Sequence, residues 1–165
     1  MNNDWRDGTV ATWLAEYARA WRVNLAEDIA AHWHARRFVF YKAEEVERMM
    51  TDWDQVLAYW RGNEALHEAV VLRFEDVAAR PLGESICAAS ARMRWDIRFA
   101  DDARMPDGSA FAHRGRAMGG ENHVALLLAR EGGETGLVGW VEAPDAPLTW
   151  LRRRYFEAAD GSVLP

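Results

Sequence analysis

The sequence predicts an α+β fold in which helices pack into a strongly curved antiparallel sheet, with one more helix at the C-terminus. Apolar residues recur at helical spacing over residues 9–60 and at alternate positions after residue 66. The 165 residues, 50% of them hydrophobic, suffice for one core without disulfides or metal. We therefore expect a single domain over residues 1–165, with the polar and charged residues 1–8 as a flexible tail.

Two helices are predicted at the start of the chain. Residues 9–23 carry an apolar stripe at helical spacing, with charged residues on the opposite side. Asn24 followed by Glu27 resembles a capping box, which predicts a short second helix over about residues 25–33. The stripe of the first helix consists of Val10, Trp13, Leu14, Tyr17, Ala18 and Trp21.

A short strand and a third helix are expected next. Residues 38–41 combine aromatic and β-branched side chains, which favours a strand. Thr51 with Asp54 three residues later indicates a helix start, and Gly62 with Asn63 indicates its end. The apolar stripe of this helix is Trp53, Val56, Leu57 and Trp60.

From residue 66 apolar residues recur at every second position, which is typical of strands with one buried face and one solvent-exposed face. Strands are predicted over residues 66–77 and 85–99, joined by a hairpin connection at residues 80–83. In the second strand, Met93, Trp95 and Phe99 share the apolar face. Two further strands, over residues 123–129 and 137–143, are joined by a turn at Gly132 and Gly133.

Two segments are harder to interpret. Residues 100–120 form either a mobile loop or, in their second half, a hairpin arm over residues 109–116 interrupted at Gly119 and Gly120. We favour the arm. After residue 147, helical spacing predicts the closing helix, with the apolar positions Leu148, Leu151, Tyr155 and Phe156.

Composition excludes several classes of partner. The net charge of −6 and the absence of a basic stripe argue against nucleic acid. Cys87 is the only cysteine, which suits a reducing compartment. No run approaches the roughly 18 apolar residues of a membrane span, so we expect a cytoplasmic protein that binds no membrane. No cofactor and no metal site are expected.

The order helix, helix, strand, helix and then long antiparallel strands resembles the nuclear transport factor 2-like superfamily, an α+β cone that includes SnoaL-like proteins. The resemblance rests on residues 15–33, 56–60 and 139–144 and covers roughly residues 9–157. It implies a cone-shaped pocket between helices and sheet. Members include isomerases, polyketide cyclases, dehydratases and transport factors, so the fold alone does not choose a function.

The nine tryptophans, four tyrosines and six phenylalanines suggest what such a pocket would bind. Rings on the elements that bound the pocket favour a small apolar or aromatic molecule, held by stacking and a few hydrogen bonds. The expected ligand-binding residues are Tyr17, Trp21, Tyr59, Met93, Trp95 and Trp140.

Candidate catalytic residues are fewer. Tyr41 stands near where the isomerases of this superfamily would carry an aspartate, which argues against a ketosteroid-type isomerase and leaves Tyr41 as a hydrogen-bond donor. Glu121 and His123 lie two apart on a strand and so share a face, where a carboxylate could tune an imidazole. The pocket is therefore expected to be rich in rings and short of carboxylates.

Two functions follow from these residues. The first is a SnoaL-like small-molecule-binding domain, with isomerase, cyclase or dehydratase activity as an open question. The alternative is a non-catalytic interaction module. A homodimer is the expected assembly.

Overall fold

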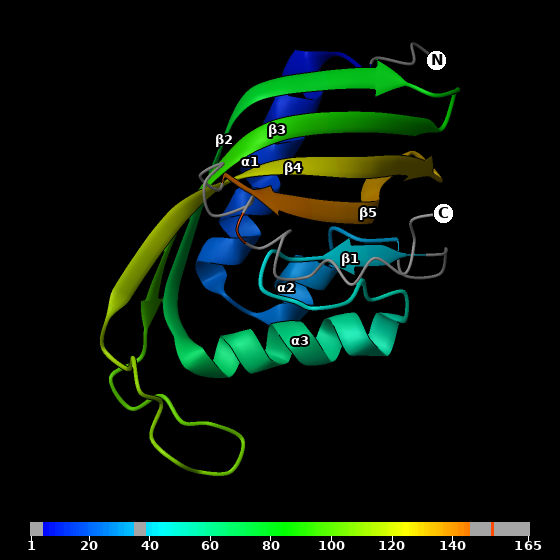
Figure 1. Ribbon diagram of the computed structural model, residues 1–165. Helices are drawn as coiled ribbons and strands as arrows, with labels where there is room; N and C mark the ends of the chain where they lie inside the picture. The colour runs from blue at the N-terminus through cyan, green and yellow to red at the C-terminus, as the bar shows by residue number, and fades with distance from the viewer. Residues whose placement is uncertain (1–4, 35–38, 146–152, 154–165) are drawn as a thin grey trace, which may run out of the picture.

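The computed structural model describes residues 5–34, 39–145 and 153, and within them it has the predicted α+β architecture (Figure 1). The strands lie in the order β1-β5-β4-β3-β2 in one curved sheet that does not close. The elements along the chain are α1 (Asp7–Val23), α2 (Ala26–Ala30), β1 (Phe40–Lys42), α3 (Trp53–Leu66), β2 (His67–Pro81), β3 (Ile86–Phe99), β4 (Ala117–Glu131) and β5 (Glu134–Pro144).

Strands β2 to β5 pair antiparallel, as expected, whereas β1 pairs parallel with β5. In this parallel pair Phe40 lies opposite Gly139. A Cβ placed on Gly139 would be 2.0 Å from Cζ of Phe40, so the glycine leaves the space that the phenyl ring occupies. The strand predicted over residues 38–41 is observed over Phe40–Lys42, so it ends one residue later than expected, and Phe38 lies outside the described residues.

The curvature of the sheet has a local cause in β2. Its pairing with β3 shifts register between His67 and Ala69 and again between Glu75 and Ala78, and Asp76 has a φ of 54°. Such bulges bend a strand and increase its twist. The long strands therefore bend along their length, as Figure 1 shows.

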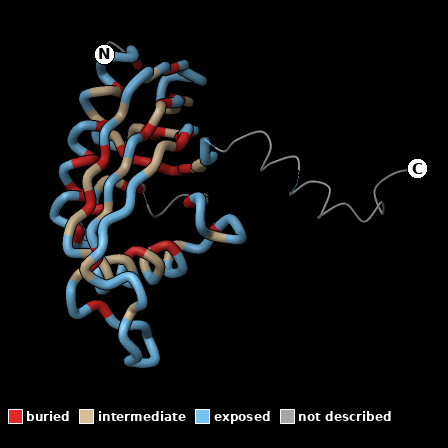
Figure 2. Tube along the Cα trace, turned by 60° about the vertical axis from the view of Figure 1, so that its left-hand side comes forward, coloured by how far each residue is buried: buried red, intermediate tan, exposed pale blue. Residues whose placement is uncertain are grey.

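The alternation predicted for β3 is confirmed. Cys87, Met93 and Phe99 are buried on the inner face, whereas the arginines between them point outwards. On the outer face they form cross-strand ion pairs: Arg92 with Glu75 at 2.7 Å, Arg94 with Glu121 at 2.9 Å, and Arg98 with Glu68 at 2.7 Å. Buried residues accordingly gather between sheet and helices (Figure 2).

Helix α1 buries the predicted stripe except for Trp13, which is half-buried, and the helix begins at Asp7. Trp5 is also buried, with the guanidinium of Arg130 4.6 Å from its ring centre. The Trp5 ring packs in the core and α1 includes Asp7 and Gly8, so residues 5–8 belong to the fold. The flexible tail expected over residues 1–8 is therefore wrong for residues 5–8. Residues 1–4 lie outside the described residues.

The predicted helix caps also differ. Asn24 is the left-handed C-cap of α1, with φ 58°, and its side chain donates to the backbone oxygen of His67 at 2.8 Å instead of capping α2. Helix α2 is shorter than expected, because Trp33 forms a bridge to Leu137 of β5. Helix α3 is capped by Asp52, whose carboxylate accepts from the backbone N–H of Gln55 at 3.1 Å.

Residues 100–116 form the connection between β3 and β4, and the hairpin arm expected over residues 109–116 is present only in part, as isolated backbone pairing without a regular strand. Arg104 bridges Ala110, the backbone N–H of Phe111 donates to Ala103 at 2.9 Å, and that of Phe99 donates to Arg116 at 3.0 Å, but the continuous strand β4 begins only at Ala117. Gly119 and Gly120 do not interrupt pairing, since they lie opposite Asp96 and Trp95 inside the ladder. The turn at Gly132 and Gly133 is confirmed, with φ of 58° and 93°.

The predicted C-terminal helix lies outside the described residues at all four of its expected apolar positions. In the part of the chain that the structure describes, no helix combines the length and the apolar character that crossing a bilayer requires.

Candidate functional site

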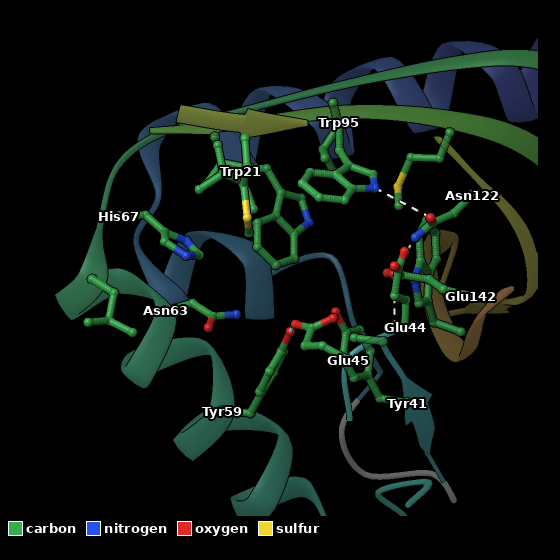
Figure 3. A pocket seen from close by; sticks show the side chains of 18 of the residues that line it. Trp21, Tyr41, Glu44, Glu45, Tyr59, Asn63, His67, Trp95, Asn122 and Glu142 are labelled. Carbon is green, nitrogen blue, oxygen red and sulfur yellow. Dashed lines mark hydrogen bonds between the residues drawn. The ribbon is translucent and has the colours of Figure 1, made fainter. Parts of the chain in front are cut away.

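A cavity of about 410 Å³ lies between the inner face of the sheet and the helices (Figure 3). Its walls come from the C-terminal half of α1, from β1 and the loop after it, from α3, and from all of the long strands. Most of the lining is apolar: Trp21, Tyr41, Ala43, Tyr59, Leu66, Val70, Leu72, Met93, Trp95, Ile97, Phe99, Met118 and Trp140.

The position of one ring depends on a glycine. A Cβ on Gly120 would be 2.7 Å from Cζ2 of Trp95, so the indole can lie across β4 only because residue 120 has no side chain. In this position the Trp95 Nε1–H donates to Oδ1 of Asn122 at 3.4 Å. The ring of Trp95 thereby forms part of the cavity wall (Figure 3).

The most organised polar group in the cavity is the carboxylate of Glu142, on β5. Its Oε1 accepts from Nε1 of Trp140 at 2.8 Å. Its Oε2 accepts from Nδ2 of Asn122 at 2.9 Å and from the backbone N–H of Glu44 at 3.2 Å. These N–H donors fix the carboxylate at one orientation, and no cationic side chain among the described residues forms an ion pair with it.

Burial raises the pKa of Glu142, because the charged form loses contact with water. The hydrogen bonds from Trp140, from the Glu44 backbone and from Asn122 oppose this shift, and the charge of Glu45 adds to it. The result is a carboxylate that binds a proton more readily than an exposed glutamate does. A group of this kind is suited to exchange a proton with a bound molecule.

Two phenols lie near this carboxylate. Tyr59 donates to Oε1 of Glu45, and burial raises its pKa, with further increases from the Glu45 charge and hydrogen bond. Tyr41 is buried, and burial likewise raises its pKa well above the usual value. Both phenols are therefore neutral at physiological pH; Tyr41 can donate a hydrogen bond to a ligand, whereas the O–H of Tyr59 is already donated to Glu45.

His67 lines the cavity where β2 begins. Its ring packs edge-on against Phe99, with 5.2 Å between ring centres, and its buried Nδ1 has no hydrogen-bond partner. Burial lowers the pKa of His67, against an opposing effect of the Glu45 charge. The imidazole is therefore neutral at neutral pH.

Six of the site residues predicted from the sequence line the cavity: Trp21, Tyr41, Tyr59, Met93, Trp95 and Trp140. Tyr17 does not. It is fully buried in the core, where its ring stacks on Trp13 and its hydroxyl accepts from Nε1 of Trp33 at 3.3 Å.

Glu121 and His123 share a face, as predicted, but it is the outer face of the sheet. Glu121 pairs with Arg94, and His123 is exposed. The reason is the alternation along β4: Asn122 between them is buried and lines the cavity, so both of its neighbours point away. The expectation that this pair acts inside the pocket is therefore corrected.

Prediction from the sequence missed most of the polar lining: Glu44, Glu45, Asn63, Asn122 and Glu142. The expectation of a pocket short of carboxylates is wrong for this reason. Glu142 could have been found, since it lies two residues after Trp140 on the same strand and hence on the same face. Glu44 and Glu45 follow β1 in a loop, where no periodicity indicates direction.

No group of three or more His, Cys, Asp or Glu residues in the described part of the chain is arranged to hold a metal ion.

Neither a protein-family model nor a curated protein matches this sequence. Solved structures do match it. A nuclear transport factor 2-like superfamily protein from Salmonella enterica serovar Typhimurium is 9% identical, with a TM-score of 0.68 over 86% of this chain and 92% of that one. Aln2 from a Streptomyces species is 12% identical, with a TM-score of 0.62 over 88% and 92%.

A hexachlorocyclohexane dehydrochlorinase is also similar, with 6% identity and a TM-score of 0.62 over 84% of this chain and 86% of that one. Identities this low describe the shape of the backbone and not the chemistry of the site. The strand order, the cavity and these matches agree with the resemblance drawn from the sequence. The chain has the nuclear transport factor 2-like fold.

Proposed function

We propose that this protein binds a small, flat, largely apolar molecule in the cavity, and that Glu142 exchanges a proton with it. The observation that carries the proposal is the Glu142 carboxylate, held by three N–H donors at the wall of a ring-lined cavity of about 410 Å³. A volume of this size falls in the range of about 300–1,000 Å³ that is common for ligand pockets.

The lining supports an apolar ligand. Indole and phenol rings on opposite walls offer flat faces for stacking, and aliphatic side chains from β2 and β3 fill the space between them. Polar groups are few and occupy defined positions, which is how small-molecule pockets orient their ligands.

The chemistry that these groups support is proton transfer, as in an isomerase, cyclase or dehydratase. Glu142 is the general base in this proposal, because its raised pKa brings it closer to neutral pH and its hydrogen bonds hold it in place. Tyr41 is a neutral donor that could stabilise developing negative charge on the bound molecule, whereas Tyr59 already donates its O–H to Glu45.

Binding is tested with Nile red, a flat neutral dye that fluoresces in apolar surroundings. Ile97→Trp places a larger side chain in the cavity, whereas Ser90→Trp adds the same side chain at an exposed position of the same strand. We expect Ile97→Trp to weaken dye binding about tenfold or more, and Ser90→Trp to leave it unchanged. Equal binding by both variants would place the dye elsewhere and contradict the proposal.

Proton transfer is tested by deuterium incorporation. Flat ketones that bind the protein are incubated with it in heavy water, and NMR measures exchange of their carbon-bound hydrogens. We expect exchange by the wild type and by Glu121→Gln, which alters the outer face of the sheet, and a loss of about 100-fold or more in Glu142→Gln. Exchange that persists in Glu142→Gln would remove Glu142 as the base.

The homodimer expected from the sequence stays a prediction, as does the cytoplasmic location. Sedimentation equilibrium measures the assembly directly. A dimer whose formation leaves Nile red binding unchanged would be compatible with the cavity as an independent ligand site.

A further inference from the structure

The acidic side chains of the cavity lining have no basic counterpart. Glu44, Glu45 and Glu142 line the cavity, whereas no lysine or arginine of the described residues does so. Lys42 directly precedes the loop that carries two of these glutamates, but its Nζ donates to two backbone oxygens of that same loop. Within the described lining, the negative charge is therefore not balanced by a cationic side chain.

These carboxylates lie on one side of the cavity, together with two phenol rings. The backbone N–H of Glu44 donates to Oε2 of Glu142 at 3.2 Å, and the next residue, Glu45, accepts from the hydroxyl of Tyr59. The ring of Tyr59 lies 5.7 Å from that of Tyr41, between ring centres. Figure 3 shows these side chains on one side of the cavity, opposite His67.

The charges on this side of the cavity act on one another. Burial is the largest cause of the raised pKa of Glu142, and the charge of Glu45 raises it further. Burial also raises the pKa of Tyr59, and the charges of Glu45 and Glu142 add to that effect. Negative potential therefore extends from the exposed Glu45 to the more deeply buried Glu142, and a positive group between them would be attracted by both.

The surroundings favour an organic cation over a metal ion. In the part of the chain that the structure describes, no group of His, Cys, Asp or Glu residues is arranged to hold a metal. Aromatic ring faces attract an ammonium group, and the apolar walls accommodate the hydrocarbon part of an amine. Because Glu45 is exposed, an ammonium beside it keeps part of its hydration, which lowers the cost of binding it.

We propose that the molecule bound in the cavity carries one positively charged nitrogen, such as a protonated amine, which lies between the carboxylates of Glu45 and Glu142 and beside the rings of Tyr41 and Tyr59. The inference rests on the proposed function, since it requires a flat, largely apolar molecule in this cavity. It adds the charge of that molecule and the residues that select it. A cation beside Glu142 also favours the ionised carboxylate, which is the form that accepts a proton.

The test compares three compounds that share a naphthalene ring. 2-Naphthylmethylamine is an ammonium ion at neutral pH, 2-naphthalenemethanol is its uncharged counterpart of nearly the same shape, and 2-naphthoate is an anion. Calorimetry measures the affinity of each. We expect the wild type to bind the amine about tenfold more tightly than the alcohol, and 2-naphthoate more weakly than either. Because the alcohol also has a hydrogen-bond donor, the difference reports charge.

Variants locate the charge that attracts the amine. Glu45→Gln keeps an oxygen that can accept from Tyr59 but removes the charge, and Glu142→Gln does the same at the inner carboxylate. Each should reduce the preference for the amine over the alcohol about threefold, and the double variant should abolish it. Glu47→Gln is the control, because it removes the same charge from an exposed position of the same loop that does not line the cavity. It should keep the full preference.

Nile red binding by each variant reports whether its cavity is intact, and Glu45→Gln changes an exposed side chain, so it tests the inference independently of Glu142. Equal affinity of the wild type for amine and alcohol, or tighter binding of 2-naphthoate, overturns the inference and leaves the proposed function in place. A preference for the amine that persists in the double variant overturns it too. If none of the compounds binds and Nile red also fails to bind, the proposed function and this inference both fail.

Discussion

The indole of Trp95 lies across Gly120 on the neighbouring strand, so close that a Cβ on the glycine would be 2.7 Å from Cζ2. Gly120→Ala should therefore displace the ring, destabilise the fold by about 1–3 kcal/mol and weaken Nile red binding. Urea unfolding and dye titration measure the two effects.

The control is Gly62→Ala in α3, where nothing lies within 4 Å of the added Cβ. Alanine favours a helix interior over glycine by about 1 kcal/mol, so this variant should be more stable and should bind the dye normally. A Gly120→Ala protein as stable as the wild type would mean that Trp95 can move at no cost.

Asn122 connects two sides of the cavity, because its amide accepts from Trp95 and donates to Glu142. Asn122→Ala leaves both groups without this partner and should lower the free energy of unfolding by about 1–3 kcal/mol. His123→Ala removes the exposed neighbour and should change stability by less than about 0.5 kcal/mol. Similar losses in the two variants would contradict the orientation of β4.

The raised pKa of Glu142 predicts how stability depends on pH. The folded protein holds this proton more tightly than the unfolded chain does, so stability falls as pH rises from the ordinary value of 4.5 through the raised pKa. The difference in unfolding free energy between wild type and Glu142→Gln should decrease over this range and then level off. A difference that stays flat or grows with pH would show that the pKa of the Glu142 carboxyl is not raised in the folded protein.

The left-handed conformation of Asn24, with φ 58°, predicts an order among its variants. Asn24→Gly keeps the conformation but loses the bond to His67, whereas Asn24→Ala loses both. We expect alanine to be about 1 kcal/mol less stable than glycine at this position. Thermal or urea unfolding of the two variants, measured against the wild type, decides whether the conformation or the side-chain bond matters more.

Much of the fold could be predicted because periodicity reports burial directly. The alternation from Cys87 to Phe99 identified the inner face of β3 correctly, and the stripe from Val10 to Trp21 identified the buried side of α1. The predictions that failed concern segments whose structure depends on contacts with residues distant in the sequence. Trp33 leaves its helix to bridge Leu137, and Gly120 pairs with Trp95 inside the ladder, where the missing side chain leaves room for the indole.

The site was predicted less completely than the fold. The rings of the cavity were predicted because periodicity indicates which aromatic residues lie on the inward faces of helices and strands. Glu142 was missed, although the periodicity that identified Trp140 also places it inside. Glu121 and His123 were assigned to the pocket by spacing alone, and spacing of two fixes a shared face without saying which face. The burial of Asn122, which decides the face, is visible only in the structure, because an asparagine between two other polar residues does not indicate an inward direction.

The phenyl ring of Phe40 fills the space above Gly139, where any side chain would collide with it. The two positions therefore form one steric unit, although 98 residues separate them in the chain. In related sequences we expect them to vary together: a side chain at the glycine position should accompany a small residue at the position of the phenylalanine. Such covariation would reveal the parallel pairing of β1 with β5 in an alignment, without any structure.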